Sequence, residues 1–302
     1  MLRVVIALPL AGCFAPAPAT GLPCADGEPR CPDGLVCVQQ PSGVETCETG
    51  PGEEPPIGED RDSDGIADLV DNCPDAPNRE QADEDGDDTG DVCDACPPFA
   101  GDSDTDLDGV GDACDPNPET PGDVLVSFNG FAAPVEGWTA DANFMALAGE
   151  GLAMANDMES ALVTLRSPAA PRVEVRTQAR LLALTAIAPS LGAISIVEQY
   201  VPQTDKGVAC QLSALANSDQ QQLRIFNLDT KLVVDTAPHT FQVGAELDLR
   251  LRRTGETYAC RATAPVLELA ADVAFTPPAP RVGLRVRGAS AIVHWVMVVS
   301  SR

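Results

Sequence analysis

Aspartates recur at a fixed spacing between residues 60 and 115, and this spacing constrains the chain more than any other feature. Three times, acidic residues occupy positions 1, 3, 5, 9 and 12 of a twelve-residue window. These aspartates are Asp60, Asp62, Asp64, Asp68 and Asp71 in the first window, Asp83, Asp85, Asp87, Asp91 and Asp94 in the second, and Asp104, Asp106, Asp108, Asp112 and Asp115 in the third. Oxygen ligands at alternate positions around one tight turn are what a Ca²⁺ ion requires.

The residues between the aspartates fit the same geometry. Gly65 and Gly109 occupy position 6, where a calcium loop turns sharply and a Cβ is costly. The second window has Asp88 there, and Asp tolerates a left-handed backbone better than most residues. Position 7 would offer a backbone carbonyl, from Ile66, Thr89 and Val110. We expect at least three calcium ions, one for each window. Position 12 holds Asp in place of the longer Glu of an EF-hand, which predicts modest affinity.

The acidic charge of the chain is concentrated in this segment. The formal net charge is −27, and residues 60–115 hold 20 Asp and Glu against two Arg. Residues 123–302, by contrast, hold 15 basic and 17 acidic residues. A block of like charge repels itself and stays disordered unless bound cations neutralise it, so a disordered acidic linker is the alternative to a metal-bound segment. Binding nucleic acid requires a basic face, and we expect no nucleic-acid partner.

Cysteine, glycine and asparagine residues occur at fixed positions relative to the aspartates. Residues 60–74 read DRDSDGIADLVDNCP and residues 104–115 read DTDLDGVGDACD, while Asn78 and Gln81 have N-x-x-Q spacing. The segment 60–115 resembles thrombospondin type 3 repeats, in which DxDxDGxxDxxDNCP alternates with DxDxDGxGDxCD. The resemblance implies a calcium-wound segment with almost no hydrophobic core, and a role in adhesion or extracellular-matrix interaction. It also implies two disulfides, Cys73 with Cys93 and Cys96 with Cys114.

The remaining cysteines suit an oxidising compartment. Of 11 cysteines, setting Cys13 aside leaves ten, which can all pair. Cys210 and Cys260 both lie in expected strands, and we predict a bridge between them. Cys93-x-x-Cys96 has the spacing of half a zinc site, but no second pair or histidine lies nearby, so zinc is the less favoured reading. A separate cluster permits three connectivities and the sequence does not choose among them. Its members are Cys24, Cys31, Cys37 and Cys47.

The first residues predict secretion and lipid anchoring. One arginine precedes the apolar run Val4–Leu10, which is too short to span a membrane and is typical of a secretion signal. The run ends in Leu-Ala-Gly-Cys13, which resembles the lipobox of bacterial lipoproteins, where the cysteine becomes the lipidated first residue. This resemblance implies a membrane partner, through a lipid anchor at the cell surface or outer membrane of a bacterium. Phe14 replaces the Asp that would favour inner-membrane retention. An ordinary signal peptide with a chance cysteine is the alternative.

Composition divides the chain into seven segments. Pro/Gly-rich stretches separate a short cysteine-rich module, the acidic segment and a long C-terminal region. The expected segments are a signal peptide with lipobox (1–13), a tether (14–22), a four-cysteine mini-module (23–48), a linker (49–59), the calcium repeats (60–115), a linker (116–122) and a β-sandwich domain (123–302).

The C-terminal region has the alternation of an all-β domain. In residues 246–253, Leu247, Leu249 and Leu251 share one face while charged residues share the other. About 180 residues of this kind suffice for a jelly roll with a real core. The fold class is therefore mainly β. The closing pattern 282–299 resembles the last two strands of concanavalin-A-like or laminin-G-like jelly rolls. Further strands are expected at 124–128, 173–184, 192–201, 208–215, 221–228, 258–264 and 281–288.

Two functions compete for this sandwich. The first is a non-enzymatic binding or adhesion domain for a glycan or an extracellular protein, presented on a calcium-stiffened stalk. The second is a sugar-binding or sugar-active jelly-roll enzyme. No E-x-D-x-E run of paired carboxylates is present, and glycoside hydrolysis uses such pairs. We therefore expect no enzyme and name no catalytic residue. The candidates for aromatic rings that stack on a sugar are Trp138, Phe144, Tyr200 and Trp295. Aromatic residues are only 4% of the chain, however, and we expect most of them in the core, Trp295 in particular because it lies in the closing strand.

Overall fold

The computed structural model divides the chain into two units, residues 1–60 and residues 61–302, and each is described by itself. The described residues are 22–23, 36–39, 45–48, 59–101, 103–131, 138–140, 144–147, 151–184, 191–215, 220–263 and 265–302. In the first unit, β1 (Leu22–Pro23), β3 (Glu45–Glu48) and β2 (Val36–Gln39) form an antiparallel sheet in the order β1-β3-β2. The lipidation prediction at Cys13 lies outside the described residues, as do Cys24 and Cys31.

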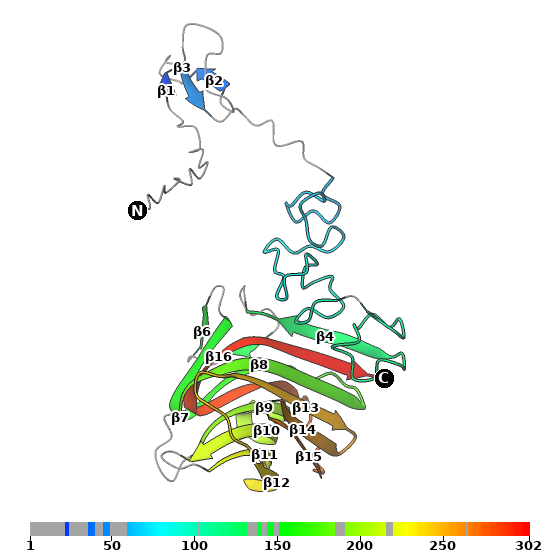
Figure 1. Ribbon diagram of the computed structural model, residues 1–302, viewed down its shortest axis with the longest axis vertical. Helices are drawn as coiled ribbons and strands as arrows, with labels where there is room; N and C mark the ends of the chain where they lie inside the picture. Colours follow the sequence, from blue (N-terminus) through cyan, green and yellow to red (C-terminus); the bar gives the residue numbers. More distant parts are fainter. Residues whose placement is uncertain are drawn as a thin grey trace, which may run out of the picture. The chain divides into compact units, whose positions relative to one another are not determined.

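The second unit contains the acidic windows from Arg61 onward and the predicted β-sandwich. Residues 59–101 and 103–122 form turns and bends without a strand or helix, as a segment with few apolar residues should. The fold prediction is confirmed: the rest of the described chain consists mainly of strands (Figure 1). Within the part of the chain that the structure describes, one 3₁₀ turn is present, at Pro202–Thr204. The strands are β4 (Asp123–Asn129), β5 (Thr139–Ala140), β6 (Phe144–Leu147), β7 (Gly151–Arg166), β8 (Arg172–Leu184), β9 (Leu191–Val201), β10 (Lys206–Leu215), β11 (Gln221–Asn227), β12 (Leu232–Pro238), β13 (Glu246–Thr254), β14 (Thr257–Thr263), β15 (Val266–Asp272) and β16 (Arg281–Ser301).

One long strand, β16, belongs to both layers of the sandwich. Its first half pairs with β9 and β7, and the pairing with β9 extends one layer in the order β12-β11-β10-β9-β16. Its second half pairs with β8 and β4, which gives the other layer as β4-β16-β8-β13-β14-β15 (Figure 1). The register shifts between Arg287 and Ala289, and Gly288 between them has a φ of 53°. The sequence predicted two closing strands here, which was wrong, because Gly288 bends one strand without ending it.

The core lies between the two layers and is closed by a disulfide. Cys210 of β10 and Cys260 of β14 are joined, as predicted from their places in strands. The alternating leucines of β13 point inward, and Leu249 and Leu251 are buried in the main apolar cluster. Glu198 and Arg253 form a buried ion pair at 3.0 Å within this core. Among the described residues, no helix has the length and apolar character needed to cross a membrane.

Candidate metal centres and the repeat–sandwich junction

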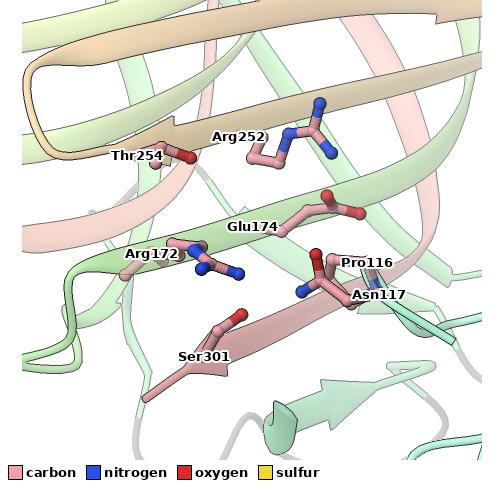
Figure 2. A pocket seen from close by; sticks show the side chains of 8 residues that line it. Pro116, Asn117, Arg172, Glu174, Arg252, Thr254 and Ser301 are labelled. Carbon is pink, nitrogen blue, oxygen red and sulfur yellow. The ribbon is translucent and has the colours of Figure 1, made fainter. Parts of the chain in front are cut away.

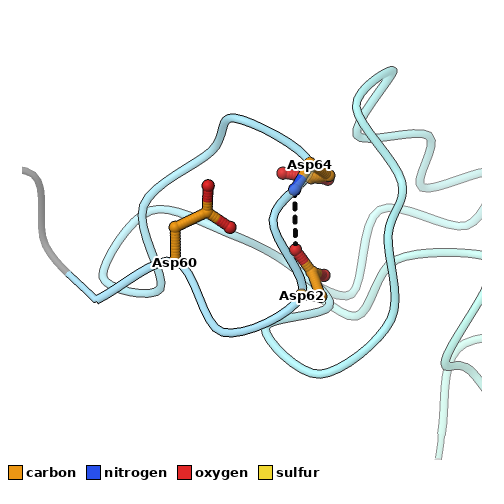
Figure 3. A group of neighbouring side chains, drawn as sticks. All are labelled: Asp60, Asp62 and Asp64. Carbon is orange, nitrogen blue, oxygen red and sulfur yellow. Dashed lines mark hydrogen bonds between the residues drawn. The ribbon is translucent and has the colours of Figure 1, made fainter.

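Each window gathers its first three aspartates into one cluster. In all three windows the carboxylate oxygens of positions 1, 3 and 5 lie within 4.8 Å of one another. Figure 3 shows the first cluster, Asp60, Asp62 and Asp64, in which Asp62 Oδ1 accepts a hydrogen bond from the Asp64 amide at 3.1 Å. The same bond from position 5 to position 3 recurs at 3.1 Å in the second window and 3.2 Å in the third. The predicted ligands at these positions are therefore brought together.

The backbone of the windows is wound tightly enough to require left-handed residues. At position 6, Gly65, Asp88 and Gly109 have φ values of 96°, 75° and 95°. Asp88 therefore adopts the strained conformation that its sequence position predicted. Position 4 is left-handed as well, which the sequence did not suggest. The residues there are Ser63, Gly86 and Leu107, with φ values of 66°, 75° and 65°.

The aspartate at position 5 ties each window to the chain that follows it. One of its oxygens accepts the amide of position 7, as Asp64 does from Ile66 at 2.8 Å. The other oxygen accepts an amide 14 residues further along the chain. These bonds are Asn78 to Asp64 at 2.8 Å, Gly101 to Asp87 at 3.3 Å and Gly122 to Asp108 at 2.8 Å. Hydrogen bonds to carboxylates thus set the pitch of the whole segment.

Several carboxylate oxygens inside the windows are buried without a hydrogen-bond partner. They belong to position 3 or position 12, and they are Oδ2 of Asp71, Asp85, Asp106 and Asp115. A buried charged oxygen without a partner costs free energy, so this arrangement fits a cation that such oxygens would coordinate. The donor set is entirely oxygen, which suits Ca²⁺ or Mg²⁺ better than a softer metal.

Position 9, which the sequence predicted to be a ligand, lies outside these clusters. Its Oδ1 instead accepts the amide of position 2, so it closes the loop on itself. The three bonds are Arg61 to Asp68 at 3.0 Å, Glu84 to Asp91 at 2.9 Å and Thr105 to Asp112 at 2.8 Å. The carbonyls of Ile66, Thr89 and Val110 stay predicted ligands.

Position 12 bonds to the following backbone and, in the third window, joins a further group of carboxylates. Asp71, Asp94 and Asp115 each accept the amide two residues ahead, at 2.8, 2.7 and 2.5 Å. The oxygens of Asp108, Asp115 and Asp123 also lie within 4.8 Å of one another. The sequence had placed Asp123 at the start of the sandwich and not among the acidic residues of the windows.

Two disulfides join the windows, and a glycine packs on each. The structure pairs Cys73 with Cys93 and Cys96 with Cys114, the same pairs that the resemblance implied. A Cβ at Gly90 would meet the Sγ of Cys73 at 2.6 Å, and one at Gly111 would lie 2.9 Å from the Cβ of Cys96. Position 8 of the second and third windows therefore has to be glycine, because the chain passes too close to the preceding bridge.

The Cys96–Cys114 bridge lies against the outer face of the sandwich. Trp295, Met297 and Val299 of β16 form an apolar cluster with this bridge and Val110, while the alternate residues of β16 face the main core. The Phe99 ring meets the Trp295 ring edge-on, with centroids 5.8 Å apart. This junction explains why the closing strand is apolar on both faces.

An arginine of the sandwich reinforces the junction. The Arg176 guanidinium lies 5.1 Å from the centroid of the Phe99 ring and donates to the Ala113 carbonyl at 2.8 Å. A cation over an aromatic face adds roughly 0.5–2 kcal/mol, depending on exposure. The third window is therefore held by the sandwich through both apolar and polar contacts.

A pocket of 400 Å³ opens beside this junction. Figure 2 shows that its walls carry the polar side chains of Asn117, Arg172, Glu174, Arg252, Thr254 and Ser301. Glu174 is 2% exposed, and burial raises its pKa even though Arg250 lies 2.5 Å away and opposes the shift. The pocket therefore combines two arginines with one buried acid.

The aromatic rings expected to stack on a sugar are not available for that role. Trp138, Tyr200 and Trp295 are 8%, 4% and 3% exposed. They pack within the sandwich or under the repeats, because large apolar surfaces are most stable when removed from water. These three candidates are therefore core residues, which is the alternative that the sequence favoured for most of the aromatic rings, and the Phe144 side chain lies outside what the structure describes.

Comparison with known proteins identifies one part of the chain. Residues 58–81 match the family model of the thrombospondin type 3 repeat, which confirms the resemblance in the first window. No curated protein matches the chain.

Solved structures with similar folds cover the sandwich. Basic winged bean lectin with Tn-antigen is 12% identical over 59% of this chain and 99% of its own, with a TM-score of 0.47. Peanut lectin with a 9mer peptide is 12% identical over 59% of this chain and 97% of its own, with a TM-score of 0.46. Carbohydrate-binding module CBM66 from Bacillus subtilis is 14% identical over 54% of this chain and 94% of its own, with a TM-score of 0.42. With identities and TM-scores this low, no ligand is carried from these proteins to this chain.

Proposed function

We propose that this chain is a calcium-binding, lipid-anchored surface protein whose acidic repeats support a β-sandwich that binds a glycan or an extracellular protein. The calcium part rests on one observation above all. The position 1, 3 and 5 carboxylates converge in all three windows. Buried oxygens such as Asp85 Oδ2 and Asp106 Oδ2 have no hydrogen-bond partner there.

Electrostatics favours a divalent cation at each cluster. Three carboxylates within 4.8 Å repel one another, and no arginine or lysine of the second or third window lies between them. Burial, with further repulsion from Asp83 and Asp94, raises the pKa of Asp91 to about 6 although the Glu84 amide opposes the shift. A calcium ion would remove this repulsion and supply the largest local charge. Ligand that binds only the folded windows would then stabilise them by mass action.

Isothermal titration of calcium into the oxidised full chain tests the proposal. We expect saturable binding of at least one ion per window, with dissociation constants of roughly 0.1–1 mM, as in extracellular modules. Asp85→Asn keeps the side-chain shape, removes one ligand charge and should abolish or weaken one site at least tenfold. Glu119→Gln removes the same charge from an exposed position outside the windows and should leave the titration unchanged. Equal titrations for Asp85→Asn and the parent chain would exclude the ligand assignment.

The binding role of the sandwich is supported by the chemistry of its pocket. Arg172, Arg252 and Asn117 offer hydrogen-bond donors to a polar ligand, and Glu174 offers an acceptor. Glycoside hydrolysis uses two carboxylates, and the described lining supplies one, so we propose binding without turnover. A panel of polysaccharides incubated with the full chain separates these roles. Retention without released sugar supports a binder, whereas released sugar supports an enzyme.

Anchoring through Cys13 rests on the sequence pattern alone. Its test is expression of the full chain in a bacterium, with fractionation and incorporation of labelled fatty acid. The parent chain should carry the label and sediment with membranes, and Cys13→Ala should lose both properties. A Cys13→Ala chain that stays labelled and membrane-bound would contradict the proposal.

A further inference from the structure

The carboxylates of Asp108, Asp115 and Asp123 meet where the third window joins the sandwich. Asp108 and Asp115 belong to the window, and Asp123 is the first residue of β4. Asp115 and Asp123 are only 8% and 2% exposed. Within the described part of the chain, none of the three forms an ion pair with a lysine or arginine. Three acids therefore share a largely dry site without a counter-charge.

Hydrogen bonds orient these acids toward one another. Asp123 accepts from the Ser301 hydroxyl with one oxygen and from the Asn117 side-chain amide, at 2.9 Å, with the other. Asp108 Oδ2 accepts the amides of Gly122 and Asp123 at 2.8 and 2.6 Å. The folded chain thus supports the site from both the window and the sandwich.

One oxygen in this group is left without a partner. Asp115 Oδ1 accepts the Asn117 amide at 2.5 Å, but Asp115 Oδ2 is buried and has no hydrogen bond. Burial, together with the neighbouring Asp123 and Asp108, raises the pKa of Asp115 to about 7 although the Asn117 amide opposes the shift. A buried carboxylate oxygen facing two other carboxylates requires either a shared proton or a cation.

We propose that Asp108, Asp115 and Asp123 form a divalent-cation site, which takes calcium and fastens the repeats to the sandwich. This rests on the proposed calcium function but adds a ligand from outside the windows. The residue 15 positions after the position 5 aspartate is Asp123 in the third window and the exposed Arg79 in the first. The second window has Asp102 at the same place, outside the described residues, so it is the first window that lacks this third carboxylate.

Occupancy of this site would also shape the neighbouring pocket. Asn117 and Ser301, which hold the two oxygens of Asp123, form part of the pocket wall beside Arg172 (Figure 2). A cation that draws Asp123 toward the window would fix the positions of both side chains. Calcium would then act on the pocket through two hydrogen bonds, without touching the ligand.

Calcium titration of three variants of the full chain tests the site. Asp123→Asn keeps the shape of the side chain and should lose one ion, or weaken one binding step at least tenfold. Glu268→Gln removes a carboxylate from an exposed place on β15 and should behave as the parent chain. Asp85→Asn reports the proposed function independently, because it belongs to the second window. If Asp85→Asn loses an ion and Asp123→Asn does not, the junction site is wrong and the calcium function stands; if neither loses one, both are wrong.

A second measurement on the parent chain covers a failure of Asp123→Asn to fold. Calcium should slow hydrogen exchange of the Gly122 and Asp123 amides, which donate to Asp108. The same slowing should occur in Asp85→Asn, whose junction is intact. Exchange at these two amides that is unaffected by saturating calcium would overturn the proposal, and would leave a proton shared between Asp115 and Asp123 as the explanation of the site.

Discussion

Removing the Phe99 ring should loosen the repeats from the sandwich. The ring makes an edge-on contact with Trp295, worth roughly 0.5–1.5 kcal/mol, and lies under Arg176, worth roughly 0.5–1 kcal/mol. Burial of part of its surface adds about 1 kcal/mol at about 25 cal/mol per Å². Phe99→Ala should therefore reduce the free energy of docking by roughly 3 kcal/mol. This corresponds to about 100-fold in the ratio of docked to undocked chain.

Tryptophan fluorescence can follow this docking. The chain has two tryptophans, and only Trp295 lies at the junction. Acrylamide quenching is measured while calcium is added to the chelated full chain, and Trp295→Phe supplies the signal of Trp138 alone. If about four ions bind together with docking, a 100-fold loss in the ratio of docked to undocked chain raises the calcium midpoint, the calcium concentration at which half of the Trp295 rings are shielded. The increase is about threefold, the fourth root of 100. A single coupled ion would give the full 100-fold shift.

Matched substitutions make the test decisive. Leu69→Ala removes an apolar side chain of the first window that is 91% exposed, so it should leave the midpoint unchanged. A Phe99→Ala midpoint within the error of the Leu69→Ala midpoint would refute the reasoning. It would mean that the Phe99 contacts contribute nothing to docking.

Further substitutions probe the core, the backbone and the charge of the repeats. Arg253→Ala leaves Glu198 charged and unpaired in the core, and urea denaturation should show a loss of roughly 3–5 kcal/mol of stability. Replacing Cys210 and Cys260 together by alanine opens a loop of 50 residues and should cost about 4 kcal/mol in the same assay, if loop entropy dominates. Leu107 is 85% exposed and has a left-handed backbone, which Leu107→Gly would relieve. The strain removed, about 1–2 kcal/mol, exceeds the entropy cost of glycine, about 0.5–1 kcal/mol, so the substitution should raise the melting temperature of the calcium-loaded chain. Without calcium, the folded pKa of Asp91 is raised from 3.8 to about 6, so its contribution to stability is present below pH 3.8 and is lost as pH rises to about 6. Asp91→Asn should flatten that part of the stability–pH curve, and an unchanged slope would count against the burial of this carboxyl.

The repeats were the part most open to prediction from sequence, since their geometry is local. Positions 1, 3 and 5 lie within five residues of one another, so their spacing alone brings the carboxylates together. The left-handed backbone of position 4 and the hydrogen bond that position 9 accepts from the position 2 amide were not predicted, for a different reason; the ligand role of position 9 stays a prediction. Leu107 at position 4 shows no preference for a left-handed backbone, and Asp112 at position 9 has the same side chain as a ligand while bonding to an amide.

The β-sandwich was predicted in kind but not in detail. Alternation along residues such as Leu247, Leu249 and Leu251 indicates a strand with one buried face, whichever strands lie beside it. It does not indicate that β16 crosses between layers at Gly288, because that depends on which strands pair with each half. Nor does it tell a tryptophan that stacks on a ligand from one that packs under another segment.

The sequence by itself determined the three oxygen-rich windows and the mainly β character of the region that follows them, because each depends on side chains placed by local geometry. The bridge between Cys210 and Cys260 joins residues 50 apart, and it was predicted from the places of both cysteines in expected strands. Only the tertiary structure decided that Trp295 packs under the third window and that Asp123 faces Asp115. Phe99 and Trp295 are far apart along the chain, and no pattern in the sequence around either residue predicts that the two rings are in contact. Their contact exists because sheet pairing puts one face of β16 outward, where the Cys96–Cys114 bridge covers it.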